Sequence, residues 1–220
     1  MKDFWKKRWE EKDIPWHQAK VEGLLENHFP KSAKHVFVPL CGKSLDLLWL
    51  SEHATSVVGC DLSDIACREF FEDHNLPFIE ESLSHCIQFK GHNLRLLAGD
   101  FFEIPLSVFT HIDLIYDRAA LFALPPGPIR NAYSEKLIQI AIHSDAAAVE
   151  ILLIGRELSP PLAEGPPFSI SSGDIKALFG HYFKIEELET VERPPRADLP
   201  GLVKETAYRL RAHPKTGFLL

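Results

Sequence analysis

The sequence has few of the residues and spacings that hold metal ions or disulfide frameworks. Only four cysteines occur among 220 residues, and none of them forms a Cys-x-x-Cys pair. The 11 histidines are scattered, without a His-Glu-x-x-His or comparable ligand spacing. These absences argue against a metal site and against a disulfide-stabilised secreted scaffold. We expect reduced, mostly buried cysteines in a cytoplasmic protein, namely Cys41, Cys60, Cys67 and Cys86.

Long apolar runs and an excess of basic residues are missing as well. No run approaches the roughly 20 apolar residues that span a bilayer, and residues 1–12 are too charged for a signal peptide. The formal net charge is −7, whereas a nucleic-acid surface needs a clustered basic excess. We therefore expect no membrane and no nucleic-acid partner, and the composition is typical of a soluble enzyme that acts on small molecules.

Segments with helical and strand-like spacing alternate along the chain, with no internal repeat, low-complexity run or linker. Seven strands are predicted, at residues 36–38, 55–60, 93–98, 112–116, 147–154, 183–188 and 205–210. Helices are predicted at residues 17–28, 45–50, 64–71, 129–143 and 173–179. Ser44 and Ser63 are suitable N-caps for two of them, and Pro128 suits the first turn of a third.

Strands separated by helices in this way form a parallel sheet with helices on both of its faces. We predict an α/β fold with a single doubly wound, mostly parallel, Rossmann-like seven-stranded sheet. Its last two strands are expected to pair as an antiparallel C-terminal edge. Residues 1–220 are predicted to form one domain, with an α/β core at residues 34–213 and an N-terminal segment, residues 1–33, that lies across it.

The loop after the first strand contains Gly42-Lys-Ser44, which looks like the end of a phosphate-binding loop. A GxxxxGK[ST] loop needs a glycine five positions before Gly42, and that position is Phe37. The dinucleotide fingerprint GxGxxG does not occur either. The sequence therefore argues against a nucleotide-hydrolysing site, and Lys43 is expected to be solvated at the start of its helix.

Three strand ends nevertheless carry groups that suit a nucleoside. In open parallel sheets, ligands bind beyond the carboxyl ends of the strands. Asp61, at the end of the second strand, is placed to accept hydrogen bonds from both hydroxyls of a ribose, or it only helps to cap the next helix. Asp100 and Phe101, after the third strand, suit the amine and the face of an adenine, or they form an ordinary turn. A nucleoside held without either phosphate motif suggests S-adenosylmethionine.

The sequence resembles the thiopurine S-methyltransferase family, particularly its bacterial members, which are class I S-adenosylmethionine-dependent methyltransferases. The blocks Pro39-Leu-Cys-Gly-Lys43 and Asp117-Arg-Ala-Ala-Leu121 are the distinctive ones. The matching segments occur in the same order and span nearly the whole chain, at residues 4–9, 15–18, 38–46, 58–63, 99–102, 116–121, 165–168 and 178–180. Asp61 is a mild departure, since the family more often has glutamate there.

The resemblance implies which residues bind the cofactor. Arg118 is expected to face both the carboxylate end of S-adenosylmethionine and the acceptor, and it is the predicted catalytic residue. A guanidinium suits that place because it stays protonated and can make two parallel bonds to a carboxylate. The alternative is that Arg118 only forms a salt bridge to Asp117. The complete predicted cofactor site is Trp5, Trp9, Leu40, Gly42, Asp61, Asp100, Phe101 and Arg118.

The N-terminal segment carries three tryptophans, Trp5, Trp9 and Trp16. They either anchor the segment to the core or, as in the family, make it a lid over the cofactor. Trp16, together with Arg118, is predicted to bind the substrate, because its ring can stack on a planar acceptor.

The predicted reaction is methyl transfer from S-adenosylmethionine to the sulfur of a small aromatic or heterocyclic thiol such as a thiopurine, which leaves S-adenosylhomocysteine. Oxyanions of selenium or tellurium are further acceptors in this prediction. The alternatives are a halide or small-thiol methyltransferase, and a non-catalytic S-adenosylmethionine sensor. No essential general base is expected, and the protein is expected to be a monomer. Residues 155–164 lack the Tyr-Asp element of many relatives, so Arg156 and Glu157 either line the acceptor site or face solvent.

Overall fold

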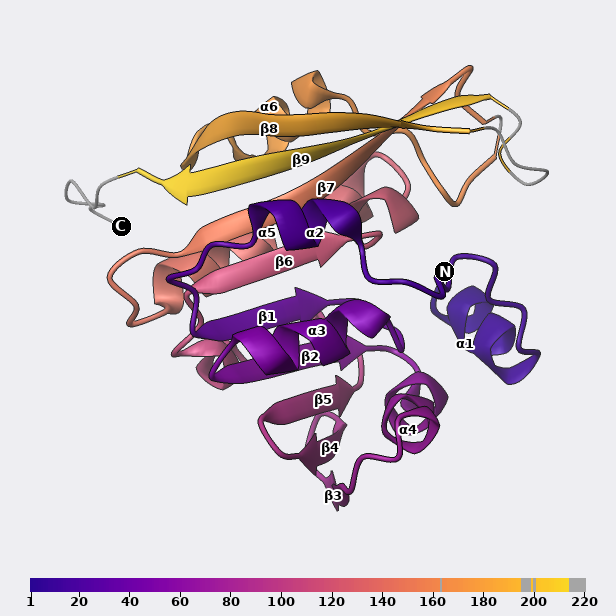
Figure 1. Ribbon diagram of the computed structural model, residues 1–220, viewed down its shortest axis with the longest axis vertical. Helices are drawn as coiled ribbons and strands as arrows, with labels where there is room; N and C mark the ends of the chain where they lie inside the picture. The colour runs from indigo at the N-terminus through magenta and orange to yellow at the C-terminus, as the bar shows by residue number, and fades with distance from the viewer. Residues whose placement is uncertain (163, 195–198, 200, 214–220) are drawn as a thin grey trace.

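The computed structural model describes residues 1–162, 164–194, 199 and 201–213. These residues form one sheet of nine strands in the order β3-β4-β5-β2-β1-β6-β7-β9-β8 (Figure 1). The strands are β1 (His35–Pro39), β2 (Ser56–Asp61), β3 (Ile79–Ser82), β4 (Ile87–Gly91), β5 (Leu94–Ala98), β6 (Leu114–Arg118), β7 (Glu150–Ser159), β8 (Phe183–Arg193) and β9 (Leu202–Ala212).

The centre of the sheet is parallel and both of its edges are antiparallel. Strands β5, β2, β1, β6 and β7 pair in parallel. β9 pairs antiparallel with β7 and β8, which confirms the predicted C-terminal edge. The prediction of seven strands is wrong, because the hairpin of β3 and β4 extends the other edge. The Ile-Glu-Glu-Ser sequence of β3 lacks an alternating apolar pattern and all four of its residues are exposed.

The α-helices are α1 (Lys2–Glu10), α2 (Gly23–His28), α3 (Leu45–His53), α4 (Asp64–Asp73), α5 (Pro128–His143) and α6 (Ser172–Phe179), and the 3₁₀ turns are η1 (Leu106–Phe109) and η2 (Leu121–Ala123). Ser44 and Ser63 accept the N-cap hydrogen bonds of α3 and α4, and Pro128 begins α5, as predicted. The predicted helix at residues 17–28 is wrong over its first half, because Glu22 is extended and caps α2. The helical form of residues 2–10 was not predicted.

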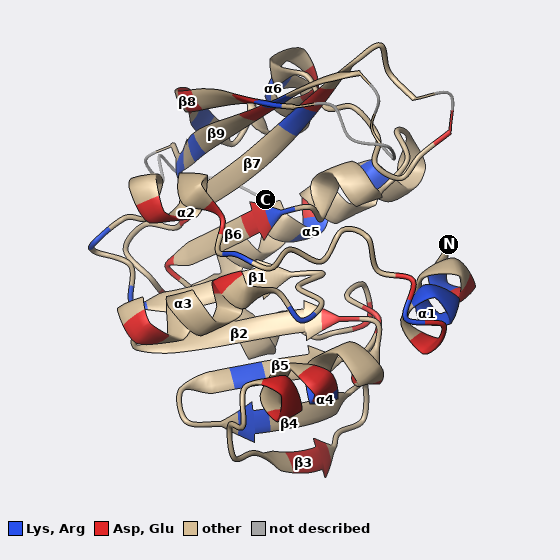
Figure 2. Cartoon of the chain, turned by 45° about the vertical axis from the view of Figure 1, so that its right-hand side comes forward, with Lys and Arg blue, Asp and Glu red and all other residues tan. Residues whose placement is uncertain are grey.

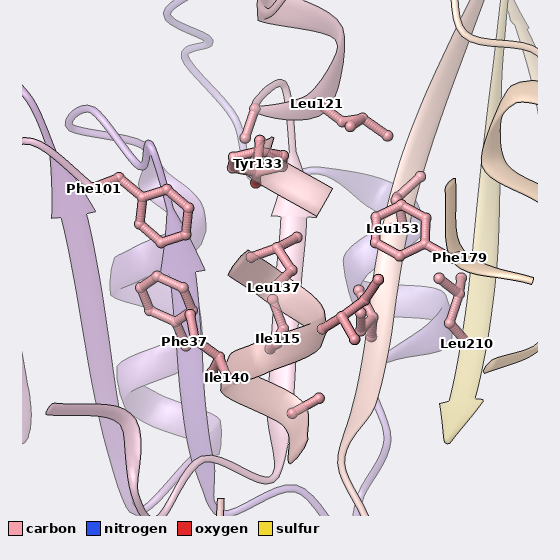
Figure 3. Close-up of a cluster of buried hydrophobic side chains, with 14 of the residues drawn as sticks. Phe37, Phe101, Ile115, Leu121, Tyr133, Leu137, Ile140, Leu153, Phe179 and Leu210 are labelled. Carbon is pink, nitrogen blue, oxygen red and sulfur yellow. The ribbon is translucent and has the colours of Figure 1, made fainter. Parts of the chain in front are cut away.

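Two apolar cores cover the two faces of the sheet. Along β1, Val36 and Val38 pack with α2, α3 and α4, whereas Phe37 between them packs on the opposite face with α5 and α6. Figure 3 shows this second core, in which Tyr133 and Leu137 of α5 lie over Phe37 and the neighbouring strands. Successive side chains of a strand point to opposite faces, so near-continuous apolar strands are what a sheet covered on both sides requires.

The parallel strands end at the same edge of the sheet, and α1 lies beyond that edge (Figure 1). Figure 2 shows a concentration of basic residues on this helix. All four cysteines are free thiols, and Cys41, Cys60 and Cys67 are buried, as predicted. Among the described residues, no helix is long and apolar enough to cross a membrane.

A buried carboxyl group in β6 makes stability depend on pH. Asp117 is fully buried, and its carboxylate accepts hydrogen bonds from the Tyr133 hydroxyl and the Leu121 amide. Burial raises the pKa of Asp117 to about 6, although these hydrogen bonds act to lower it. The stability that the protonated Asp117 carboxyl group provides is therefore complete below the pKa that an aspartate has in the unfolded chain. This stability is lost as the pH rises through about 6.

Asp117→Asn removes this titration and keeps an acceptor for Leu121. Relative to the wild type, the variant is expected to gain stability as the pH rises from 4 to 6, by at most about 1.4 kcal/mol per pH unit. Urea unfolding at a series of pH values checks the difference. The quantity to follow is the free energy of unfolding of the variant minus that of the wild type. If this quantity stays constant or falls between pH 4 and 6, the buried carboxyl group is not the source of the pH dependence.

Candidate functional site

A cavity of about 290 Å³ lies at the carboxyl ends of the parallel strands, close to the lower limit of the roughly 300–1,000 Å³ that small-molecule sites occupy. Its walls come from α1, the loop of residues 15–18, the ends of β1, β2, β6 and β7, and η2. Seven of the predicted site residues line it: Trp5, Trp9, Trp16, Leu40, Gly42, Asp61 and Arg118.

The loop after β1 turns sharply under the N-terminal segment. Leu40 and Gly42 have φ of +45° and +52°, and Ala119, which follows β6, has a φ of +67°. All three line the cavity. Non-glycine residues in this region cost on the order of 1–3 kcal/mol each and are concentrated at functional sites. The ring of the buried Trp9 lies against Gly42, where a Cβ atom would be 3.1 Å from its Cζ2.

Gly42→Ala is expected to lower the free energy of unfolding by about 1–2 kcal/mol, because alanine strains the left-handed backbone. The new methyl group also pushes on Trp9, so the near-ultraviolet circular dichroism should change. Gly23→Ala is the matched control, since Gly23 has an ordinary φ and nothing within 4 Å of the added methyl group. Equal stability of the two variants in urea would contradict backbone strain at Gly42, and an unchanged circular dichroism spectrum would contradict its close contact with Trp9.

Asp61 ends β2 with a carboxylate that faces the cavity and organises its floor. One oxygen accepts the Gly42 amide at 2.8 Å and the other accepts the Ser63 amide at 2.9 Å. Burial raises the pKa of Asp61, while the hydrogen bonds from Ser63 and Gly42 act to lower it. A carboxylate has about four acceptor positions, so two remain for a ligand. Asp61 thus holds two backbone amides and also lines the cavity, while its contact with a ribose stays a prediction.

Asp100 and Phe101 lie outside the residues that line the cavity. Asp100 pairs with Lys2 of α1 and accepts the Phe102 amide at 3.0 Å. The Phe101 ring is buried in the apolar core against Phe37 and Tyr133 (Figure 3). Their contact with an adenine thus stays a prediction, whereas the Lys2–Asp100 pair ties α1 to the end of β5.

Arg118 is held in a buried polar cluster, and its partner is Asp46 and not Asp117. Its Nε donates to Asp46 at 2.6 Å and its Nη2 donates to Ser44 at 2.9 Å. Asp46 also accepts the Tyr116 hydroxyl and the Glu22 amide, both at 2.9 Å. Burial acts to lower the pKa of Arg118, but the nearby Asp46 carboxylate raises it above its ordinary value. Arg118 therefore stays charged, and among the described residues none accepts from its Nη1 donors.

The three tryptophans of the N-terminal segment form one aromatic cluster above the cavity. The Trp16 ring meets Trp5 and Trp9 edge to face, with centroids 5.1 and 6.1 Å away. The Arg8 guanidinium lies 5.1 Å from the centre of the Trp16 ring. The segment thus covers the cavity through aromatic contacts, and one face of Trp16 is shared with a cation.

Several lining residues were not predicted or were predicted differently. Lys43 is not solvated, because it pairs with Glu69 at 2.7 Å and Asp73 at 2.9 Å on α4. Arg156 lines the cavity and Glu157 does not. Asp46, Phe122 and Arg8 also line it and were missed. Asp46 and Arg8 had a usable signal, since they lie in the matched segments 38–46 and 4–9, whereas Phe122 had none.

A second hollow of about 530 Å³ lies at the opposite edge of the sheet, near His35, Asp113 and Glu150. This edge carries the amino ends of the parallel strands, where open α/β sheets do not bind their ligands. The smaller cavity at the carboxyl ends is therefore the candidate site. Neither hollow offers a metal centre, because no group of three metal-ligating side chains occurs within the described part of the chain.

Comparison with known proteins points to one family. The model of the thiopurine S-methyltransferase family matches residues 1–209. A thiopurine S-methyltransferase from Methylococcus capsulatus is 36% identical over 96% of this chain and 97% of its own length. One from Nitrosospira multiformis is 37% identical over 81% of each chain.

Solved structures share the fold at much lower identity. The 1,6-didemethyltoxoflavin-N1-methyltransferase of Burkholderia thailandensis has a TM-score of 0.66 at 14% identity, covering 96% of this chain and 86% of its own. The N-methyltransferase NodS of Bradyrhizobium japonicum has a TM-score of 0.65 at 11% identity, covering 94% and 97%. Both were solved with S-adenosylhomocysteine. The chain therefore belongs to the thiopurine S-methyltransferase family of S-adenosylmethionine-dependent methyltransferases.

Proposed function

We propose that this protein transfers the methyl group of S-adenosylmethionine to the sulfur of a small aromatic or heterocyclic thiol, such as a thiopurine. The observation that carries the proposal is the arrangement of the cavity along the edge of the sheet. Asp61 at the end of β2 offers acceptors at one end, while Trp16, Phe122 and Arg156 provide aromatic and cationic groups elsewhere on the wall.

The residues present fit the cofactor. The two unused acceptor positions of Asp61 suit the two hydroxyls of a ribose, and the Nη1 donors of Arg118 suit a carboxylate. Leu40 and Trp9 supply apolar contacts beside them. When bound, S-adenosylmethionine supplies a methyl group on a positively charged sulfur, which makes that carbon electrophilic.

The chain's own contribution is to position the thiol and to exclude water. Trp16 offers a ring on which a planar acceptor can stack, and Trp5, Arg8 and Trp9 of α1 line the cavity and help to exclude water from it. Holding two reactants in line can supply roughly 7–11 kcal/mol of the barrier in favourable cases. The positive charge of Arg118 also favours a thiolate over a thiol, so methyl transfer needs no dedicated base.

His17 is the titratable side chain that most resembles a base, since it lines the cavity. Burial, together with Lys43, lowers its pKa, so the imidazole is neutral at pH 7. His17→Ala is expected to lower kcat/KM by no more than about tenfold, because the proposed reaction needs no general base. Loss of a general base would instead lower the rate by ~10²–10⁴. Steady-state rates with a saturating methyl donor check this, and a fall beyond about a thousandfold would show an essential base.

The proposed function is tested with a labelled methyl donor and a panel of acceptors. We expect methylation of 6-mercaptopurine and thiophenol, with S-adenosylhomocysteine as the second product. Hydrosulfide, iodide, selenite and tellurite are the comparison acceptors. Faster methylation of iodide or hydrosulfide would identify a halide or small-thiol methyltransferase. Calorimetric binding of S-adenosylhomocysteine without turnover of any acceptor would identify a sensor, and either result would overturn the proposal.

A further inference from the structure

Arg156 lies at the far end of the cavity from Asp61. The sheet order β2-β1-β6-β7 places the strand of Arg156 three positions from the strand of Asp61. At about 4.8 Å per strand, the two ends are separated by roughly 14 Å. In the proposed function the nucleoside lies at Asp61 on β2, and Arg118 on β6 lies two strands further along the sheet. The end of β7 therefore remains for the acceptor. Arg156 is therefore a residue of the acceptor end.

The guanidinium of Arg156 is fixed on two sides. Its Nε and Nη2 both donate to Oε1 of Glu205, with the Nε contact at 3.0 Å. Its central carbon lies 4.4 Å from the centre of the Phe122 ring. Glu205 is only 3% exposed, and its other oxygen accepts from Nε of Arg193 at 2.6 Å. The side chain is thus held in one orientation before any ligand arrives.

One edge of this guanidinium has no partner among the residues that the structure describes. A guanidinium has five N–H donors, and the Nε/Nη2 edge is used by Glu205. No described residue accepts from the Nη1/Nη2 edge, although the side chain is only 15% exposed and lines the cavity. Two parallel N–H groups on one edge match the two oxygens of a carboxylate.

The surroundings of Arg156 suit a ring that carries such a group. Pro166, Pro167 and Leu199 are apolar residues that line the same cavity. Burial acts to raise the pKa of Glu205, but Arg156 and Arg193 lower it below its ordinary value. Glu205 therefore remains ionised and keeps Arg156 in place. A neutral acceptor would leave the free guanidinium edge unpaired inside a largely apolar pocket, which is unfavourable.

We propose that the acceptor is an aromatic or heterocyclic thiol bearing a carboxylate on its ring, and that Arg156 is the residue that selects it. The inference rests on the proposed function and names its substrate class. The pair of N–H donors on the outer edge of Arg156 binds the carboxylate, Phe122 and Glu205 keep the guanidinium in position, and the prolines contact the ring. The thiol at the opposite side of the ring then points toward Arg118.

The experiment measures binding to the protein saturated with S-adenosylhomocysteine, so that no turnover is needed. The probes are 4-mercaptobenzoate and 4-mercaptobenzamide, which share shape and thiol and differ in charge. We expect the wild type to bind the acid at least about tenfold more tightly than the amide, because a hydrogen bond to a charged group increases affinity by at least about that factor. Arg156→Gln should abolish this preference, and Arg156→Lys should retain part of it, since lysine keeps the charge without the second donor edge.

Arg211→Gln is the matched control. Arg211 lies on β9, the strand that pairs with the β7 strand of Arg156, and is half exposed, but it does not line the cavity. Its removal changes the net charge equally and should keep the preference for the acid. Equal binding of the two probes by the wild type would overturn the inference, and so would an undiminished preference in Arg156→Gln. Failure of the proposed function has a different signature, namely no methylation of any thiol by the wild type.

Discussion

Replacing Asp46 with alanine is expected to lower the free energy of unfolding by about 3–5 kcal/mol, the usual cost of leaving one member of a buried ion pair without its partner. The Asp46 side chain is 1% exposed and that of Arg118 is 10% exposed. The same carboxylate accepts the Tyr116 hydroxyl and the Glu22 amide, so the substitution also leaves these donors unpaired. Arg118 would then carry its charge in the interior with only Ser44 as a partner.

Urea unfolding of a small set of variants checks this expectation. Glu11→Ala breaks the exposed ion pair with Lys7 and should change stability little, because solvent screens such pairs. The double variant of Asp46→Ala and Arg118→Leu should be less destabilised than the sum of its two single variants, since it removes the unpaired charge. Strict additivity, or a loss below about 1 kcal/mol for Asp46→Ala, would contradict a buried charge pair.

The central sheet could be predicted because its signals are local. Val36, Phe37 and Val38 are buried on two faces, and the short apolar runs of the other parallel strands have the same cause. The hydroxyls of Ser44 and Ser63 accept hydrogen bonds from amides two or three residues away, so the N-caps can be predicted from the local sequence. The acid at the end of β2 followed from the rule that parallel sheets bind ligands at the carboxyl ends of their strands.

Other features depend on partners that are distant in the sequence. The helix predicted at residues 17–28 begins only at Gly23, because the Glu22 amide donates to Asp46, 24 residues later, and the Glu22 carboxylate accepts from Arg193. The partner of Arg118 lies 72 residues away, so the adjacent Asp117 was the only candidate that the sequence offered. Arg156 pairs with Glu205 across β7 and β9. No local pattern specifies these contacts.

The same distant contacts connect the N-terminal segment to Arg156 on the wall of the cavity. The Glu22 amide donates to Asp46, which in turn accepts from Arg118. The Glu22 carboxylate accepts from Arg193. Arg193 also donates to Glu205, the carboxylate that fixes Arg156. Arg118 and Arg156, two of the arginines that line the cavity, are thus oriented by one carboxylate-rich interior network. Contacts between residues far apart in the sequence therefore link the segment that contains Glu22 to Arg118 and to Arg156.

Asp61→Ala is expected to raise the dissociation constant of S-adenosylhomocysteine by about a hundred- to ten-thousandfold. The variant removes both acceptors proposed for the ribose, and a hydrogen bond to a charged group contributes about 1.5–3 kcal/mol, with about 1.4 kcal/mol for each factor of ten. It also releases the Gly42 and Ser63 amides, so the floor of the cavity loses its support. The effect on binding should therefore exceed the effect of any single lost hydrogen bond.

Titration calorimetry, paired with urea unfolding of the same samples, separates lost ligand contacts from lost structure. Asp64→Ala is the control, because Asp64 lies three residues further on, is exposed and does not line the cavity; its binding should be unchanged. Asp100→Ala tests the predicted contact of Asp100 with an adenine. If that contact exists, the variant binds S-adenosylhomocysteine more weakly than the wild type, although Asp100 pairs with Lys2 in this structure. If Asp61→Ala binds as tightly as the wild type, Asp61 holds only the backbone of the loop, and the nucleoside must lie elsewhere along the edge of the sheet.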